Sequence, residues 1–414
     1  MVTKQLDVFR KSEALVGTII EKMGNINKSQ KKFLIHIMIL FLGLRGRYNF
    51  LGMARYGSNS EQTYRNNFEK GFDFLSFNSN LIRRCCSKEL IVVFDPSYIP
   101  KSGKKTEHIG TFWSGCAQKA KRGLEIGGFA VVDIENNTAF SLEAVQTPAS
   151  KELNKVGKSL VTHYASKTIE RKEVLRSFSK YLVADGYFAK KEYVNPVIEE
   201  TGMEVISKLR NDANLSYVYK GPPTGLKGRP KVLDGKIKMK RIDKRKIRFC
   251  YQDEESIVYE GIVYSKTLKR KIKIAYVEKI KKDTFKEKYA VLFSTDLEIS
   301  GEQIYLYYKS RFQIEFLYRD AKQFTGLTHS QAQSANKLYF HFNLSLSAVS
   351  IAKAIHYLTI PKEERGAFSM SDIKTMYLNK IVADRIISNL KIDMTCKKSR
   401  RAYLNSLWFG KIAS

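Results

Sequence analysis

The sequence predicts an α/β protein with a helical region at each end, and three patterns predict this class. Up to about residue 85, apolar side chains recur at helical spacing, as in Phe33, Ile37, Leu40 and Leu44. From about residue 88, short apolar or alternating runs typical of β-strands take over. After residue 300, long helical patterns and a basic helical tail return. We therefore expect helices around a central core that contains a sheet.

Composition predicts a folded protein of two or three domains. The chain has 414 residues, of which 43% are hydrophobic and 12% aromatic. The strongest apolar run, residues 33–44, is shorter than the roughly 18 residues that a membrane span needs. The N-terminus lacks the pattern of a secretory signal, and the five cysteines show no zinc or disulfide spacing. We expect a cytoplasmic, nucleoid-associated protein with no membrane contact and with reduced thiols.

The formal net charge of +31 indicates a polyanionic partner. A compact protein tolerates such self-repulsion poorly unless opposite charge normally covers it. Nucleic acid is the commonest such partner, because lysines and arginines at phosphates release condensed counterions. An anionic membrane would also attract a basic protein, but no amphipathic anchor or lipidation motif is visible. The charge therefore favours DNA or RNA.

Residues 1–87 are interpreted as a helical DNA-binding domain. Ser60 is a plausible N-cap after the turn at residues 57–60. The helix that follows carries Tyr64, Arg65 and Asn66, which would enter a major groove in helix-turn-helix fashion. The alternative is an ordinary helical hairpin with a polar face.

The central region has the element order of a ribonuclease-H-like core. It predicts a strand, a hairpin turning at Asn136 and Asn137, two helices, and two further strands. The predicted spans are residues 90–94, 127–147, 151–163, 168–180, 181–184 and 204–209. We assign residues 88–215 to the first part of this core.

A basic, β-rich insertion is predicted over residues 216–300, and it separates the two parts of the core. Within it, residues 219–248 hold 12 basic against two acidic residues, and alternating strand patterns follow. The run from Gly228 to Lys231 contains Arg229 and resembles a minor-groove hook, so Arg229 and Lys231 are predicted DNA contacts. The alternative is a solvated loop. Residues 301–360 would complete the core, and residues 361–414 would form a helical C-terminal region.

Two aspartates follow apolar strands of the predicted core. Asp95 comes after the run 90–94, and Asp185 after 181–184. Carboxylates held at a sheet edge are suited to Mg²⁺, and a pair of such ions supports in-line displacement at phosphorus. Taken singly, a strand-end aspartate is more often a turn or cap residue.

A third acid lies on the helix predicted over residues 302–324. Tyr308, Arg311, Glu315 and Lys322 fall within one stripe of this helix, and Arg319 lies close to it. An acid among cations and an aromatic ring is suited to a phosphodiester substrate. The alternative is a solvated face with i,i+4 ion pairs.

These residues resemble the DDE transposases of bacterial insertion sequences. Their spacing matches the Tyr-x2-Arg-x3-Glu-x6-Lys signature of the group called insertion-sequence family four. Asp185 to Phe188 (DGYF) is similar to the second-acid motif of the family, and Arg210 matches the basic residue after it. The run VFDPSYIPKSGKK around Asp95 is similar to the first block.

The resemblance implies a metal-dependent transposase. Asp95, Asp185 and Glu315 would bind two Mg²⁺ or Mn²⁺ ions, and Tyr308, Arg311 and Lys322 would hold the DNA strand near the break. The partners implied are double-stranded DNA, as terminal inverted repeats and as target, and a second copy of the chain on that DNA. Two alternatives stay open, namely a catalytically silent DNA-binding protein of this fold and a nuclease that cleaves without joining.

Overall fold

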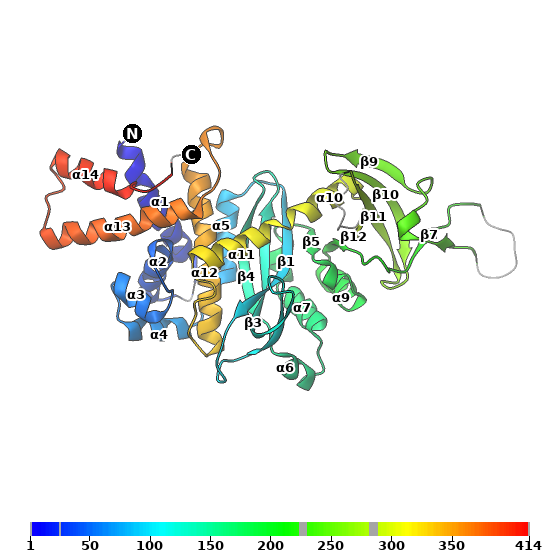
Figure 1. Cartoon of the computed structure of the whole chain (residues 1–414), viewed down its shortest axis with the longest axis horizontal. Helices are drawn as coiled ribbons and strands as arrows, with labels where there is room; N and C mark the ends of the chain where they lie inside the picture. Colours follow the sequence, from blue (N-terminus) through cyan, green and yellow to red (C-terminus); the bar gives the residue numbers. More distant parts are fainter. Residues whose placement is uncertain (1, 25, 223–229, 281–288, 413–414) are drawn as a thin grey trace.

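The computed structural model describes residues 2–24, 26–222, 230–280 and 289–412. It consists of helices gathered from both ends of the chain, a central sheet, and a further group of strands on the opposite side of that sheet (Figure 1). The predicted α/β class is confirmed.

The described residues up to Cys85 are mainly helical, as their apolar spacing predicts. These helices are α1 (Val2–Lys22), α2 (Lys28–Gly43), α3 (Phe50–Tyr56), α4 (Glu61–Glu69) and α5 (Phe74–Cys85). Ser60 is the N-cap of α4, as predicted, and its side chain accepts a hydrogen bond from the Thr63 backbone N–H at 3.2 Å.

The central sheet follows, with helices between its strands. Its elements are β1 (Leu90–Pro100), β2 (Gly110–Ser114), β3 (Lys119–Asp133), β4 (Thr138–Gln146), α6 (Ser150–Lys155), α7 (Leu160–Ile169), α8 (Lys172–Arg176), β5 (Tyr181–Ala184), α9 (Lys191–Thr201) and β6 (Glu204–Lys208). Strand β3 pairs antiparallel with β1, β2 and β4, whereas β1, β5 and β6 run parallel to one another. The hairpin of β3 and β4 turns through Asn137 at positive φ, as its sequence predicts.

The prediction of two helices over residues 151–163 and 168–180 is wrong. The segment holds three shorter helices, α6, α7 and α8. The first break falls at Gly157, which has a φ of +64°. A new helix then begins behind Ser159, whose side chain caps it by accepting from the Thr162 N–H.

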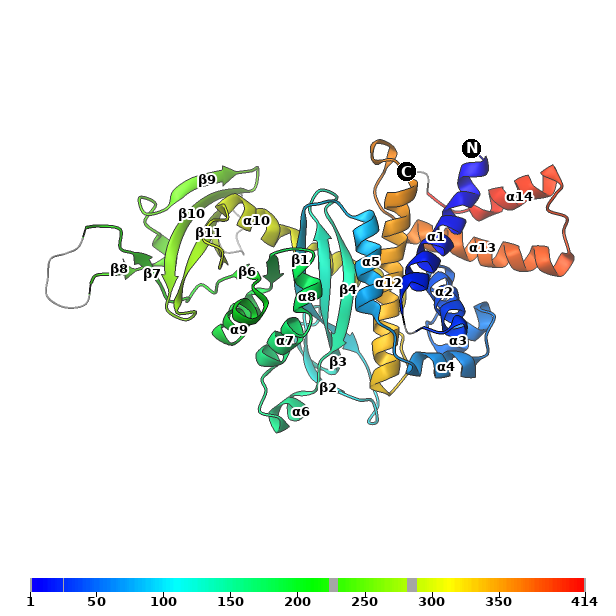
Figure 2. The same cartoon turned by 180° about the vertical axis from the view of Figure 1, so that it is seen from behind.

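The stretch between the second and third acids is rich in strands. These are β7 (Leu215–Val218), β8 (Leu233–Lys236), β9 (Arg248–Gln252), β10 (Ser256–Ser265), β11 (Arg270–Lys279) and β12 (Tyr289–Ser294). Strand β12 pairs antiparallel with β6, so these strands continue the central sheet and do not form a detached sheet. Figures 1 and 2 show them on the side away from the terminal helices.

The last part of the chain is helical. It comprises α10 (Gly301–Ser310), α11 (Gln313–Phe324), α12 (Ala335–Thr359), α13 (Met370–Leu390) and α14 (Lys397–Leu407). The single helix predicted over residues 302–324 is therefore two helices, α10 and α11. At the junction, Phe312, Ile314 and Glu315 donate to carbonyls three residues back, and this tighter bonding interrupts the α-helical pattern.

Helix α12 is the centre of the helical half of the molecule. Together with α5 it lies against one face of the sheet, while α7 and α9 lie on the other side (Figures 1 and 2). Nearly all of its side chains from Leu338 to Ile355 are buried, because the terminal helices cover its remaining faces. No helix of the described ranges combines the length and the apolar character needed to cross a bilayer.

Tyr48 connects three parts of this fold. It is 3% exposed, and its hydroxyl lies 2.9 Å from the carbonyl of Leu44 at the end of α2 and 2.6 Å from that of Phe324 at the end of α11. The ammonium of Lys374, on α13, donates to the same hydroxyl. One side chain therefore ties the N-terminal helices and α13 to the helix that carries the third acid.

We expect Tyr48→Phe to lower the free energy of unfolding by about 1–3 kcal/mol. The carbonyls of Leu44 and Phe324 and the ammonium of Lys374 would each lose a hydrogen-bond partner. Urea unfolding followed by circular dichroism measures this change. The matched control is Tyr264→Phe on β10, at a half-buried position, where we expect a change below about 0.5 kcal/mol. Equal stability of the Tyr48 variant and the wild type would contradict the role given to this hydroxyl.

Candidate active site

Asp95 lies inside strand β1, not just past its end as the sequence predicted. The strand continues to Pro100 because β3 pairs with it over its whole length. The Asp95 side chain is 17% exposed. Burial raises the pKa of its carboxyl to about 7; the Arg311 guanidinium opposes this shift, and the nearby carboxylates of Glu315 and Asp185 add to it.

Asp185 follows β5, the parallel neighbour of β1, as predicted. Ala184 pairs with Phe94, so the two aspartates are the next residues along adjacent strands. The Asp185 side chain is 45% exposed and accepts from the Tyr187 N–H at 3.2 Å, which begins a short 3₁₀ turn at Gly186. Sheet pairing therefore brings together two acids that lie far apart in the sequence.

Glu315 joins them through Arg311. The Arg311 guanidinium lies 2.9 Å from the Asp95 carboxylate, 3.4 Å from that of Glu315 and 3.9 Å from that of Asp185. The Asp185 and Glu315 oxygens face the same guanidinium nitrogen, so they cannot be farther apart than the last two distances together. The structure thus gathers the three acids that the sequence singled out.

The other residues of the helical stripe lie around this group. The Tyr308 ring lies 5.6 Å from the Arg311 guanidinium, and burial raises the pKa of its hydroxyl to about 12. Lys322 donates to the Ser97 hydroxyl at 2.9 Å, two residues after Asp95 on β1, and burial lowers the pKa of its ammonium. Arg319 is 60% exposed and pairs with Asp320 at 3.1 Å.

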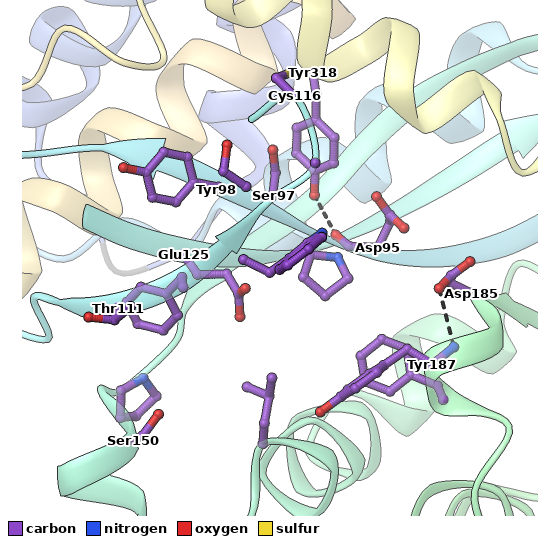
Figure 3. A pocket seen from close by; sticks show the side chains of 18 of the residues that line it. Asp95, Ser97, Tyr98, Thr111, Cys116, Glu125, Ser150, Asp185, Tyr187 and Tyr318 are labelled. Atoms are coloured by element: carbon purple, nitrogen blue, oxygen red, sulfur yellow. Dashed lines mark hydrogen bonds between the residues drawn. The ribbon is translucent and has the colours of Figure 1, made fainter. Parts of the chain in front are cut away.

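A cavity of about 1310 Å³ opens beside these residues (Figure 3). All three acids line it, together with Arg319 and Lys322. Its remaining wall includes Tyr98 and Tyr187, which lie in the first- and second-acid motifs, and residues that the sequence did not single out, among them Phe112, Trp113, Glu125, Leu160 and Tyr318. For Ser97 and Tyr318 a signal existed, since Ser97 shares a strand face with Asp95 and Tyr318 follows Glu315 by three residues on α11.

Residues 87–351 match the protein family described as transposase DDE domain. The match covers well over half of the chain and includes the three gathered acids and their surroundings. The chain belongs to this family of DDE transposases. A search of curated proteins found no match. The resemblance inferred from the spacing of the acids is therefore confirmed at the level of the family.

Membership in the DDE transposases implies a DNA-binding, nucleic-acid-cleaving enzyme of a kind that generally uses divalent metal ions. The donor set fits such ions, because three carboxylates supply the hard oxygen ligands that Mg²⁺ and Mn²⁺ take. No three His, Cys, Asp or Glu side chains in the described parts of the chain are already arranged as a ligand cluster. Instead, the Arg311 guanidinium lies among the three acids.

The predicted DNA contacts outside the cavity have different outcomes. Tyr64 is a correction: its side chain is fully buried and its hydroxyl lies 2.7 Å from His36 Nε2, so it faces the helical core and not a groove. Arg65 is 47% exposed but pairs with Glu61 on its own helix, and Asn66 is exposed. Both of these contacts stay predictions.

Two basic positions near the strands β7 and β8 also stay predictions. Arg210 is 78% exposed, pairs with Asp212 at 3.2 Å, and lines a smaller cavity together with Asp185. Lys231 pairs with Asp234 at 3.1 Å. Arg229, the centre of the predicted minor-groove hook, lies outside the described residues.

Close packing between α11 and the sheet positions the first acid of this transposase. The Tyr318 hydroxyl donates to the Asp95 backbone carbonyl at 2.6 Å. It fits there because Gly128, the partner of Asp95 on β3, has no side chain; a Cβ at that position would overlap the hydroxyl. The glycine therefore makes room for the contact that holds Asp95 against α11.

We expect Gly128→Ala to lower the free energy of unfolding by about 1–3 kcal/mol, because the added methyl overpacks the contact with Tyr318. The cost should be smaller in a Tyr318→Phe background, since the overlapping oxygen is gone. Urea unfolding of the two single variants and the double variant gives this coupling. If Gly128→Ala lowered stability equally in both backgrounds, overlap with the Tyr318 hydroxyl would not be the cause of the loss.

Proposed function

We propose that this transposase cuts DNA at the ends of its own element and joins the freed 3′-hydroxyls to target DNA. Asp95, Asp185 and Glu315 would hold two Mg²⁺ or Mn²⁺ ions. The observation that carries the proposal is the convergence of the three carboxylates on one guanidinium, each within 3.9 Å, at the wall of a large cavity.

The strand order supports a ribonuclease-H-like core. The strands run β4, β3, β1, β5, β6 across the sheet, with the first three antiparallel and β5 and β6 parallel to β1. This order places the first two acids on adjacent strands. Contacts of Tyr318 and Lys322 with β1 support a place for α11, and so for Glu315, beside the same strands.

Bound divalent ions would supply an activated water or 3′-hydroxyl and would stabilise the leaving oxygen. The residues of the chain would bind and orient the strand. Lys322, held at Ser97 beside Asp95, is in place to contact a phosphate next to the break, and Tyr308 would support the strand end through its ring. The net charge of +31 would add attraction along the DNA backbone, and a dimer is the assembly we expect on two element ends.

The test uses the purified full chain and a labelled duplex that carries the inverted repeat flanking its coding region. A duplex with a scrambled end is the control. With Mg²⁺ we expect a free 3′-hydroxyl at the element end and a joined product, and with EDTA neither. Cutting without joining would favour the nuclease, and binding without cutting would favour a catalytically silent DNA-binding protein; either outcome overturns the proposal.

A further inference from the structure

Arg311 makes contacts that a residue reserved for DNA phosphate would not make. Its side chain is only 12% exposed, and its two terminal nitrogens face all three acids. Among the described residues, its buried Nε has no hydrogen-bond partner. A buried arginine that serves a permanent ion pair normally has its donors satisfied. The contact between Arg311 and the acids is therefore suited to exchange, in which another cation replaces the guanidinium at the carboxylate oxygens.

The three carboxylates need a cation between them. Each lies within 3.9 Å of the same guanidinium, and like charges held so close together repel strongly in a poorly solvated site. One guanidinium among three carboxylates leaves the group negative. Divalent ions would be attracted to the same oxygens, but they would be repelled by the guanidinium that already contacts them.

The position of Arg311 in the chain suits an exchange. It lies at the junction of α10 and α11, where the bonding pattern tightens. The Tyr308 ring, 5.6 Å from the guanidinium, offers a surface on which a displaced cation can remain close to the site. Asp95, Asp185 and Glu315 line the cavity, so there is open space next to the acids that the guanidinium contacts.

We propose that Arg311 is a positioning residue that holds Asp95, Asp185 and Glu315 together until divalent ions bind and then yields their oxygens to the ions. The inference rests on the proposed function, which assigns the same three acids to metal. Arg311 is thus both the organiser of the site and the competitor of its metals. After displacement, its charge is free to meet a phosphate of the bound strand.

The test measures Mn²⁺ binding to the full chain by isothermal titration calorimetry, without DNA. We expect Arg311→Met to bind Mn²⁺ about tenfold tighter or more than the wild type, because a like charge has been removed. In EDTA the same variant should unfold at a lower temperature, and Mn²⁺ should raise its unfolding temperature more than that of the wild type. Lys309→Met on α10, which removes an exposed cation bound to Asp253 and Glu255, should match the wild type in Mn²⁺ affinity.

Arg311→Lys serves as the second variant, also where the methionine variant does not fold. Lysine keeps the charge but lacks the forked donors, so we expect Mn²⁺ affinity between those of the wild type and Arg311→Met. Unchanged or weaker Mn²⁺ binding in both Arg311 variants, with binding lost in Glu315→Gln, would overturn the inference and leave the metal site intact. Mn²⁺ binding that Glu315→Gln does not alter would instead refute the metal site itself, and the inference with it.

Discussion

Replacing Glu315 with glutamine is expected to lower strand cleavage at least about 100-fold while leaving DNA binding close to that of the wild type. Removing an outer-shell partner of a metal ligand typically lowers metal affinity or activity 10- to 100-fold, and Glu315 is a proposed ligand itself. Glutamine has nearly the same shape but carries no charge, so the fold around α11 should persist. Cleavage of the labelled duplex in Mg²⁺ and a gel-shift assay on the same DNA measure the two effects.

The matched control is Glu302→Gln. Glu302 lies on the first turn of α10, close in sequence to the third acid but not among the residues that line the cavity. The same loss of charge there should leave cleavage within about twofold of the wild type. A Glu315→Gln enzyme that cleaves as fast as the control would remove Glu315 from the catalytic group, whatever the spacing of the signature suggests.

The acids were predictable from the sequence because each is marked by a local pattern. Asp185 ends a short apolar strand before a glycine, and Glu315 lies among cations at helical spacings; both patterns survive in the structure. The position of Asp95 within its strand was not predictable. The end of β1 depends on its pairing with β3, whose residues come some thirty positions later.

Features that depend on distant partners were not predictable either. The burial of Tyr64 depends on His36 on α2, and helical spacing alone does not show which face of α4 meets that helix. The contact of Arg311 with three acids depends on sheet pairing and on the change of bonding between α10 and α11. The wall of the cavity around Trp113 comes from β2, a strand that the sequence did not indicate.

Lys353 on α12 is another such feature, with a measurable effect on stability. Its side chain is 3% exposed and donates to the Ala139 carbonyl on β4 at 2.9 Å. Burial lowers the pKa of its ammonium to about 8; the carboxylate of Asp320 and the thiol of Cys86 oppose this shift, and Arg319 adds to it. The unfolded chain binds this proton up to a pKa near 10.5, so between the two values the unfolded state carries more protons than the folded state.

The free energy of unfolding should therefore rise with pH through this window, by up to about 3 kcal/mol from Lys353 alone. Below pH 8 the ammonium is charged in both states, and the cost of burying it is fully present. The unfolding free energy of Lys353→Met should lack this rise. From pH 8 to pH 10.5 the wild type should therefore gain up to about 3 kcal/mol of stability relative to the variant. Urea unfolding of both proteins across that range isolates the effect, because their other titrating groups cancel. If the unfolding free energies of the two proteins changed with pH in parallel, Lys353 would keep an ordinary pKa. The attraction of Asp320 would then offset the whole effect of burial on this ammonium.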